Sequence, residues 1–324
     1  MNKSHRIGIV ALVMVSLLAG AVSAAPKSGG GTKSDIKLAY VSMNLANPWN
    51  VAVMKGFEAA CQELGVQYLS IDSQYKVDKQ VSDIENLINN NFSGFTFTPI
   101  DPNATRALVE TAKARGIATG SIAQMQDNVH LIYTLKEYDY GWSIGTQAGE
   151  WIRDNLGGRA KVAIISQDNV EAVIPRGNGV QEAILKLCPN VQIVSRQAGD
   201  IPEKGQQIIE SVLQAHPDLN VVVATNDSGG IGGYRAMVAG GKVGNDRAVF
   251  SGDATAEALA CMRESNGIYR GTVDLFPYKG GYESAKILYK YVTEGIPPTQ
   301  ETIYLPYVPV PRADLLSGKY VPQN

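Results

Sequence analysis

The fold is decided by residues 41–50, VSMNLANPWN, because one regular element ends and the next begins within this stretch. The apolar run at 36–41 is typical of a buried strand. From Trp49 to Leu64 apolar residues recur at helical spacing, and Pro48 suits a first helical turn, where its missing N–H costs nothing. Ligands of open α/β sheets bind beyond the carboxyl ends of the strands. The polar turn is therefore predicted to form one wall of a binding cleft.

The same alternation continues along the chain. Further strands are expected at 66–71, 94–98, 117–122, 129–133, 161–166, 191–195, 221–224, 249–251, 268–273 and 303–305. Further helices are expected at 77–90, 104–115, 138–155, 174–187, 203–215, 231–239, 256–264 and 281–293, before a Pro-rich tail. Helices of about a dozen residues between strands indicate parallel βαβ units. These strands are too many for one sheet, so two lobes are predicted, with a break near 135–137. The pattern leaves open how the last helix returns to one lobe.

The beginning of the chain is typical of a secretory signal peptide. A short basic start precedes an apolar run at 7–21 and the small residues 22–24. Cleavage is expected after Ala24, because a cut one residue later would fall next to Pro26. An uncleaved membrane anchor is the alternative, although the run is short for a membrane span. Residues 25–34 are predicted to be a flexible leader.

Composition narrows the classes of function. The 324 residues are 44% hydrophobic and 19% charged, as in ordinary globular proteins. A net charge of -2 indicates neither nucleic acid nor an anionic membrane surface as a partner. The cysteine count is odd, so at least one thiol is free in an exported chain. Cys61 is expected to be buried on the apolar face of its helix, whereas spacing leaves open whether Cys188 and Cys261 form a disulfide.

The sequence contains no constellation typical of an enzyme. Its three histidines form no dyad and have no metal-ligand spacing. The stretch SGGIGG at 228–233 is similar to a phosphate-binding loop, but Arg235 occupies the third glycine position of the dinucleotide fingerprint. These glycines are expected to let the ligand or the partner lobe approach closely. The chain is therefore expected to be no enzyme and to use neither a cofactor nor a metal.

Seven short motifs follow one another along the chain. They are Asn47-Pro48-Trp49, Asp72-Ser73-Gln74, Pro99 to Asp101, Arg176 to Gly179, Asn226-Asp227, Gly252-Asp253, and Thr272-Val273 with Pro277. In their order and spacing, from about Lys37 to Tyr307, they resemble the periplasmic sugar-binding proteins of the ribose-binding type. The resemblance implies an α/β fold of two Rossmann-like lobes, the type I periplasmic binding protein fold, joined by a three-segment hinge.

The resemblance also implies the division into lobes and the partners. The N-terminal lobe is expected to comprise 35–136 plus 276–305, and the C-terminal lobe 137–275 plus 306–324. Crossings are expected near 135–137, 274–275 and 305–307. A monomeric periplasmic protein is expected to capture a small-molecule ligand by lobe closure and to deliver it to the permease of an ABC transporter. The alternative is a ligand sensor that presents its ligand to a chemoreceptor or a sensor kinase.

Eight positions match the ligand site of this family. They are Asn47, Trp49, Asn50, Gln124, Arg176, Asn226, Asp253 and Asp274. An amide donates and accepts at once, which suits a hydroxyl. An indole can stack on the apolar face of a sugar, and a guanidinium can bind two hydroxyls or a carboxylate. The alternatives are core packing for Trp49 and a surface position for Arg176. For Asn47, Asn226 and Asp253 the alternative is helix capping.

The sequence departs from the family's pattern at specific positions. Ala123 and Gln124 stand where ribose-binding proteins have an Asp-Arg pair, so their sugar specificity does not transfer. Asn50 replaces a second aromatic residue. Leu275 replaces a glutamine, although Asp274 beside it is expected to reach the site. The loss of aromatic and charged partners favours a small neutral ligand, a pentose or a polyol, over a large hexose, with a non-sugar ligand as the alternative.

Overall fold

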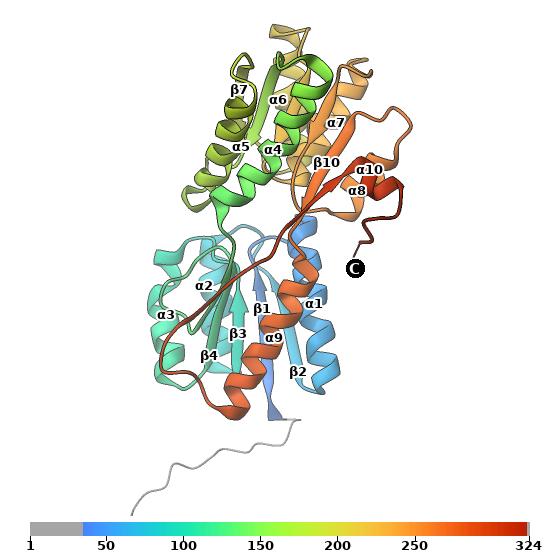
Figure 1. Cartoon of the computed structure of the whole chain (residues 1–324). Helices are drawn as coiled ribbons and strands as arrows, with labels where there is room; N and C mark the ends of the chain where they lie inside the picture. Colours follow the sequence, from blue (N-terminus) through green and yellow to red (C-terminus); the bar gives the residue numbers. More distant parts are fainter. Residues whose placement is uncertain (1–34, 323–324) are drawn as a thin grey trace, which may run out of the picture. The chain divides into compact units, whose positions relative to one another are not determined.

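Two six-stranded sheets organise the computed structural model, which describes residues 35–322 (Figure 1). The predicted signal peptide and leader lie outside the described residues. The first sheet has the order β11-β5-β4-β3-β1-β2 and is parallel throughout. Its strands are β1 (Lys37–Ser42), β2 (Gln67–Asp72), β3 (Gly94–Phe97), β4 (Ala118–Ala123), β5 (Leu131–Thr134) and β11 (Glu301–Tyr304).

The second sheet has the order β12-β10-β9-β8-β6-β7 and is parallel except for β12. Its strands are β6 (Lys161–Ser166), β7 (Gln192–Ala198), β8 (Val221–Ala224), β9 (Ala248–Phe250), β10 (Tyr269–Asp274) and β12 (Val308–Pro311). Central strands such as β3 and β8 are buried along their whole length. Burial on both faces explains why β8, with the sequence VVVA, is an apolar run without alternation.

Helices connect the strands of each sheet. Those of the first sheet are α1 (Pro48–Leu64), α2 (Val77–Asn89), α3 (Pro102–Ala114) and α9 (Pro277–Glu294). Those of the second are α4 (Glu137–Leu156), α5 (Ile174–Leu187), α6 (Pro202–Ala215), α7 (Asp227–Ala239), α8 (Ala256–Arg263) and α10 (Arg312–Leu316), with a 3-10 turn at Glu171–Val173. None of the helices within 35–322 is long and apolar enough to cross a membrane.

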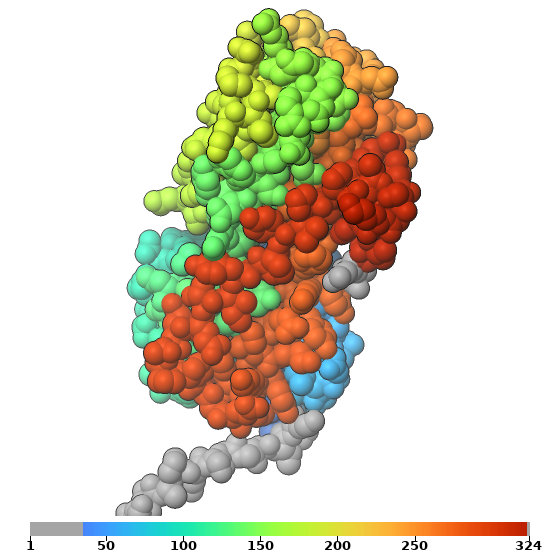
Figure 2. Space-filling model, in the orientation of Figure 1, coloured from blue at the N-terminus to red at the C-terminus, as the bar shows by residue number. Residues whose placement is uncertain are grey.

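The chain passes between the sheets three times, after β5, after β10 and after β11. The second passage brings α9 back to α1, which is the return that the sequence pattern left open. Glycines make this packing close: a Cβ on Gly281 would lie 1.9 Å from the carbonyl oxygen of Val53, and one on Gly56 would lie 1.8 Å from that of Tyr278. The third passage runs along the surface, in the red part of the colour scale (Figures 1 and 2).

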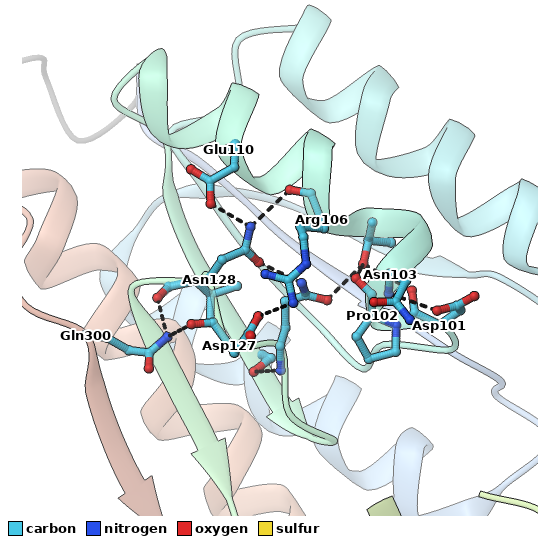
Figure 3. Close-up of polar contacts among 12 residues, drawn as sticks. Asp101, Pro102, Asn103, Arg106, Glu110, Asp127, Asn128 and Gln300 are labelled. Atoms are coloured by element: carbon cyan, nitrogen blue, oxygen red, sulfur yellow. Dashed lines mark hydrogen bonds and ion pairs between the residues drawn. The ribbon is translucent and has the colours of Figure 1, made fainter. Parts of the chain in front are cut away.

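A polar network fastens the start of β11 to the first sheet (Figure 3). The side chain of Gln300 donates to the backbone carbonyl of Asp127 at 2.7 Å. The carboxylate of Asp127 pairs with Arg106 of α3 at 2.7 Å. The neighbouring Asn128 donates to Glu110 of the same helix, also at 2.7 Å. The loop before β5 thus joins α3 to the segment that precedes the third passage.

Two predictions of secondary structure from the sequence are wrong. The expected Pro-rich tail contains β12 and α10. Pro309 and Pro311 are compatible with β12 because it is an edge strand, paired only with β10. Helix α7 begins at Asp227, four residues earlier than predicted, so the glycine-rich stretch is helical.

The α7 glycines serve helix packing within the second sheet's lobe. A Cβ on Gly232 would lie 2.0 Å from the carbonyl oxygen of Pro202, and one on Gly229 would lie 2.3 Å from that of Gly199. The close approach is therefore that of the α6 segment, and the expectation of a ligand or partner lobe at these glycines is wrong. The three cysteines are free, with Cys61 and Cys188 buried, so Cys188 and Cys261 form no disulfide.

Candidate ligand-binding site

A cavity of about 70 Å³ lies where the carboxyl ends of strands from both sheets meet. Seven of the eight predicted site residues line it, namely Asn47, Trp49, Asn50, Gln124, Arg176, Asn226 and Asp253. Asp274 does not. The lining also includes polar residues that the sequence did not single out, among them Thr98, Glu137 and Gln167.

The first wall of the cavity is the start of α1. Asn47 caps this helix, since its side-chain oxygen accepts from the backbone N–H of Trp49 at 2.9 Å. The capping alternative for Asn47 is therefore confirmed, and the residue still lines the cavity. The Trp49 side chain is only 8% exposed and belongs to the hydrophobic core. Asn50 donates to the backbone carbonyl of Asn44 at 2.8 Å.

Gln124 lies on the turn that follows β4. The preceding residue, Ala123, has a φ of 66°, and its carbonyl oxygen accepts from the hydroxyl of Thr134 at 2.8 Å. This left-handed conformation aims the turn toward the cavity at some steric cost. Within residues 35–322, the side-chain amide of Gln124 makes only a weak contact to the sulfur of Met43 at 3.9 Å. Its amide is thus a neutral donor and acceptor on the cavity wall.

Arg176 is held in the second wall, and it is 7% exposed rather than on the surface. Its Nε donates to Glu137 at 2.7 Å, and Nη1 donates to Gln167 at 3.3 Å and to the carbonyl of Thr225 at 3.1 Å. Its guanidinium also stacks on Tyr140 at 4.9 Å. Burial alone would lower the pKa of Arg176, but the charge of Glu137 raises it overall. The arginine therefore stays charged, and Nη2 has no hydrogen bond recorded within 35–322.

Glu137 is the functional candidate that sequence reasoning missed. The sequence predicted only that Glu137 lies in a segment that crosses between the lobes. In the structure it begins α4, two residues after the buried Leu135. A carboxylate directly after the end of β5 was the available signal, because that is where parallel strands present ligand-facing groups. Its ion pair with Arg176 balances the charge of the cavity.

Asp253 and Asp227 form a buried carboxyl pair in the second wall. Asp253 is 4% exposed and accepts from the hydroxyl of Tyr140 at 3.3 Å. Burial, followed by the charge of Asp227, raises the pKa of Asp253 well above its usual range. Burial also raises the pKa of Asp227, although Thr255 and Thr272 donate to it at 2.6 Å and 2.8 Å. A raised pKa reduces the negative charge of the cavity near neutrality.

Asn226 and Asp274 have structural partners. The oxygen of Asn226 caps α7 through the N–H of Gly229 at 3.0 Å, and its amide nitrogen donates to the carbonyl of Asp200 at 3.0 Å. Asp274 accepts from the N–H of Phe276 at 2.7 Å and from the hydroxyl of Tyr320 at 2.6 Å. It lines a different cavity, because successive residues of an extended segment point to opposite sides and the adjacent Leu275 faces the ligand cavity.

The comparisons with known proteins agree with this arrangement. A family described as "Periplasmic binding protein domain" matches residues 38–296. The chain belongs to this family. Its members are substrate-binding proteins of ABC transporters, so the chain is a transport component and not an enzyme. The ribose import binding protein RbsB of Bacillus subtilis is 30% identical over 242 residues, which cover 74% of this chain and 77% of that protein.

More distant relatives extend the comparison. The xylitol-binding protein of Mycolicibacterium smegmatis is 21% identical, with 85% of this chain and 79% of that protein covered. Among solved structures, a Thermotoga lettingae 5-methylthioribose transporter solute-binding protein superposes with a TM-score of 0.78 at 20% identity, covering 89% of this chain and 90% of that chain. A Caulobacter myo-inositol binding protein gives 0.75 at 20% identity, covering 87% and 96%. The predicted type I fold of this periplasmic binding protein is thereby confirmed.

Proposed function

We propose that this periplasmic binding protein captures a small neutral pentose or polyol between its lobes and delivers it to its transporter. The observation that carries the proposal is the gathering of seven predicted residues, from both sheets, around one cavity. Among the residues that line this cavity, the ion pair of Arg176 with Glu137 is internally balanced. The remaining groups are amides, an indole and a carboxyl group with a raised pKa. Such a lining favours hydroxyls over charged ligands.

Lobe closure supplies the mechanism. We assign 35–136 plus 276–305 to one lobe and 137–275 plus 306–324 to the other. Ligand first contacts Asn47, Trp49 and Gln124 in the open form, and closure then adds Arg176 and Asp253. Ligand must bind the closed form better, since otherwise the equilibrium would not move. The closed form is what a permease would recognise.

A thermal-shift experiment on residues 25–324 tests the proposal. A ligand that binds only the folded state raises the melting temperature in proportion to the logarithm of its excess over Kd. Pentoses, pentitols, hexoses, amino acids and quaternary amines form the panel. Shifts with a pentose or a polyol are expected. Shifts confined to charged or nitrogenous compounds would overturn the ligand class and leave the fold unaffected.

Export and assembly belong to the same proposal. Cleavage after Ala24 and a monomeric mature chain are expected, and mass spectrometry of the exported protein with light scattering checks both. Presentation of the ligand to a chemoreceptor or sensor kinase is a second candidate role beside transport. A permease gene adjacent to the coding sequence would favour transport.

A further inference from the structure

Two polar atoms in the first wall of the cavity have no hydrogen-bond partner within 35–322. They are the indole nitrogen Nε1 of Trp49 and the side-chain oxygen Oδ1 of Asn50. Both residues line the cavity, and they are 8% and 3% exposed. Because a buried polar atom without a partner costs about 1–3 kcal/mol, a ligand group that pairs with either atom is favoured by that amount at most.

The hydrogen-bonding role of each atom is fixed. The Nδ2 group of Asn50 donates to the carbonyl oxygen of Asn44 at 2.8 Å. Turning the amide over would place two acceptor oxygens against each other, so Oδ1 is the unpaired atom. An amide oxygen only accepts, and an indole N–H only donates. Consecutive residues in the first turn of α1 thus offer one donor and one acceptor, which is the pairing that a hydroxyl can satisfy.

This wall is poorly suited to stacking. The Trp49 ring packs within the hydrophobic core, which leaves little of its face exposed. The neighbouring position, where the sequence comparison expects a second aromatic, is the polar Asn50. A pyranose that stacks its C–H face against this wall would leave Nε1 and Oδ1 unpaired. A linear polyol carries a hydroxyl on every carbon and can pair with both.

We propose that Trp49 and Asn50 bind ligand hydroxyls and select a polyol over the aldose with the same carbon skeleton. The inference rests on the proposed function, whose pentose-or-polyol class it narrows. The other polar residues of the cavity are compatible, because Gln124 and the balanced Arg176–Glu137 pair offer further neutral recognition.

Calorimetric titration of the full mature chain against matched pairs tests the selection. The pairs are xylitol with D-xylose, ribitol with D-ribose, and D-arabinitol with D-arabinose. At least one polyol is expected to bind tenfold or more tightly than its own aldose. A preference below tenfold in every pair that binds would overturn this inference and leave the proposed function standing. Absence of binding by all six compounds would overturn this inference, and the thermal-shift panel would then decide the proposed function.

Variants identify the residues responsible. Trp49→Phe retains an aromatic ring without the N–H, and Asn50→Leu retains the size but removes both the oxygen and the bond to the carbonyl of Asn44. Each is expected to weaken polyol binding fivefold or more and aldose binding less than twofold. Trp151→Phe, which removes an indole that does not line this cavity, serves as the control and should leave Kd unchanged. Changes within twofold in both test variants would contradict the assignment. The wild-type comparison remains decisive if a variant fails to fold.

Discussion

At the scale of single residues, Arg176 is where binding and folding are most closely linked. Arg176→Ala is expected to weaken ligand binding by about 2–5 kcal/mol, as for other truncated buried charge pairs. It also leaves Glu137 without its partner at 2.7 Å, so stability should fall as well. Calorimetry and urea unfolding measure the two effects separately. The double variant Arg176→Ala with Glu137→Gln should recover stability but not binding. A binding loss below about 0.5 kcal/mol would mean that Arg176 does not contact the ligand.

Asp253 predicts a pH dependence that is opposite to the usual behaviour of a carboxylate. Its pKa is raised by burial and by Asp227, so the folded state favours the protonated acid. This contribution to stability is full below the unfolded pKa and is lost as pH rises through the folded pKa. Relative to wild type, Asp253→Asn should therefore gain stability from pH 4 to 7, by up to about 1.4 kcal/mol per pH unit. Urea unfolding at four pH values checks this; a constant difference would show that the acid titrates normally.

At the scale of elements, the loop between β4 and β5 carries Gln124 and is held by a buried amide. Gln126 has no exposed surface, accepts from Thr105 at 2.9 Å and donates to Asn128 at 2.6 Å. Gln126→Ala leaves the side-chain oxygen of Asn128 unpaired and leaves Thr105 only its longer bonds of 3.4 Å to the carbonyls of Asp101 and Pro102. It should destabilise the protein by about 1–3 kcal/mol. It should also weaken ligand binding, because the loop positions Gln124. The exposed neighbour Met125 is the control, and Met125→Ala should change stability by less than about 0.5 kcal/mol. Equal effects on unfolding would contradict the anchoring role.

The helices and strands also show which parts of the fold could be predicted from the sequence. Helices and central strands were predictable because apolar periodicity reports burial directly, as in β6 and α5, whose observed bounds match those expected. Strand β12 was missed because its prolines argue against a strand, and only the tertiary position at a sheet edge permits them. Helix α7 was predicted to start too late because glycine lowers helix propensity, whereas here it permits close packing with α6.

The residues of the candidate site also fall into those that the sequence could predict and those that it could not. Residues that follow a strand end, such as Asn226 and Asp253, could be predicted because topology alone brings strand ends together. Arg176 lies within α5 and was predicted from the family resemblance. Asp274 was expected in the cavity because it is next to Leu275 in the sequence. Successive side chains of an extended segment point to opposite sides, however, so Leu275 faces the cavity and Asp274 faces away from it. The Glu137 ion pair and the unpaired atoms of Trp49 and Asn50 depend on side-chain geometry. No spacing in a sequence encodes that geometry.

At the scale of the whole molecule, the three passages between the sheets make closure the mechanism to test. The cavity draws its walls from both lobes, so a ligand that contacts both must favour the closed form. Moving a two-state equilibrium from 1:99 to 99:1 requires about 10⁴-fold tighter binding to the favoured state. Saturating ligand should therefore reduce the radius of gyration measured by small-angle X-ray scattering. Arg176→Ala, saturated to the same degree, should contract less, because it lacks a contact made by the second lobe. Equal contraction in both proteins would mean that contacts other than Arg176 drive closure.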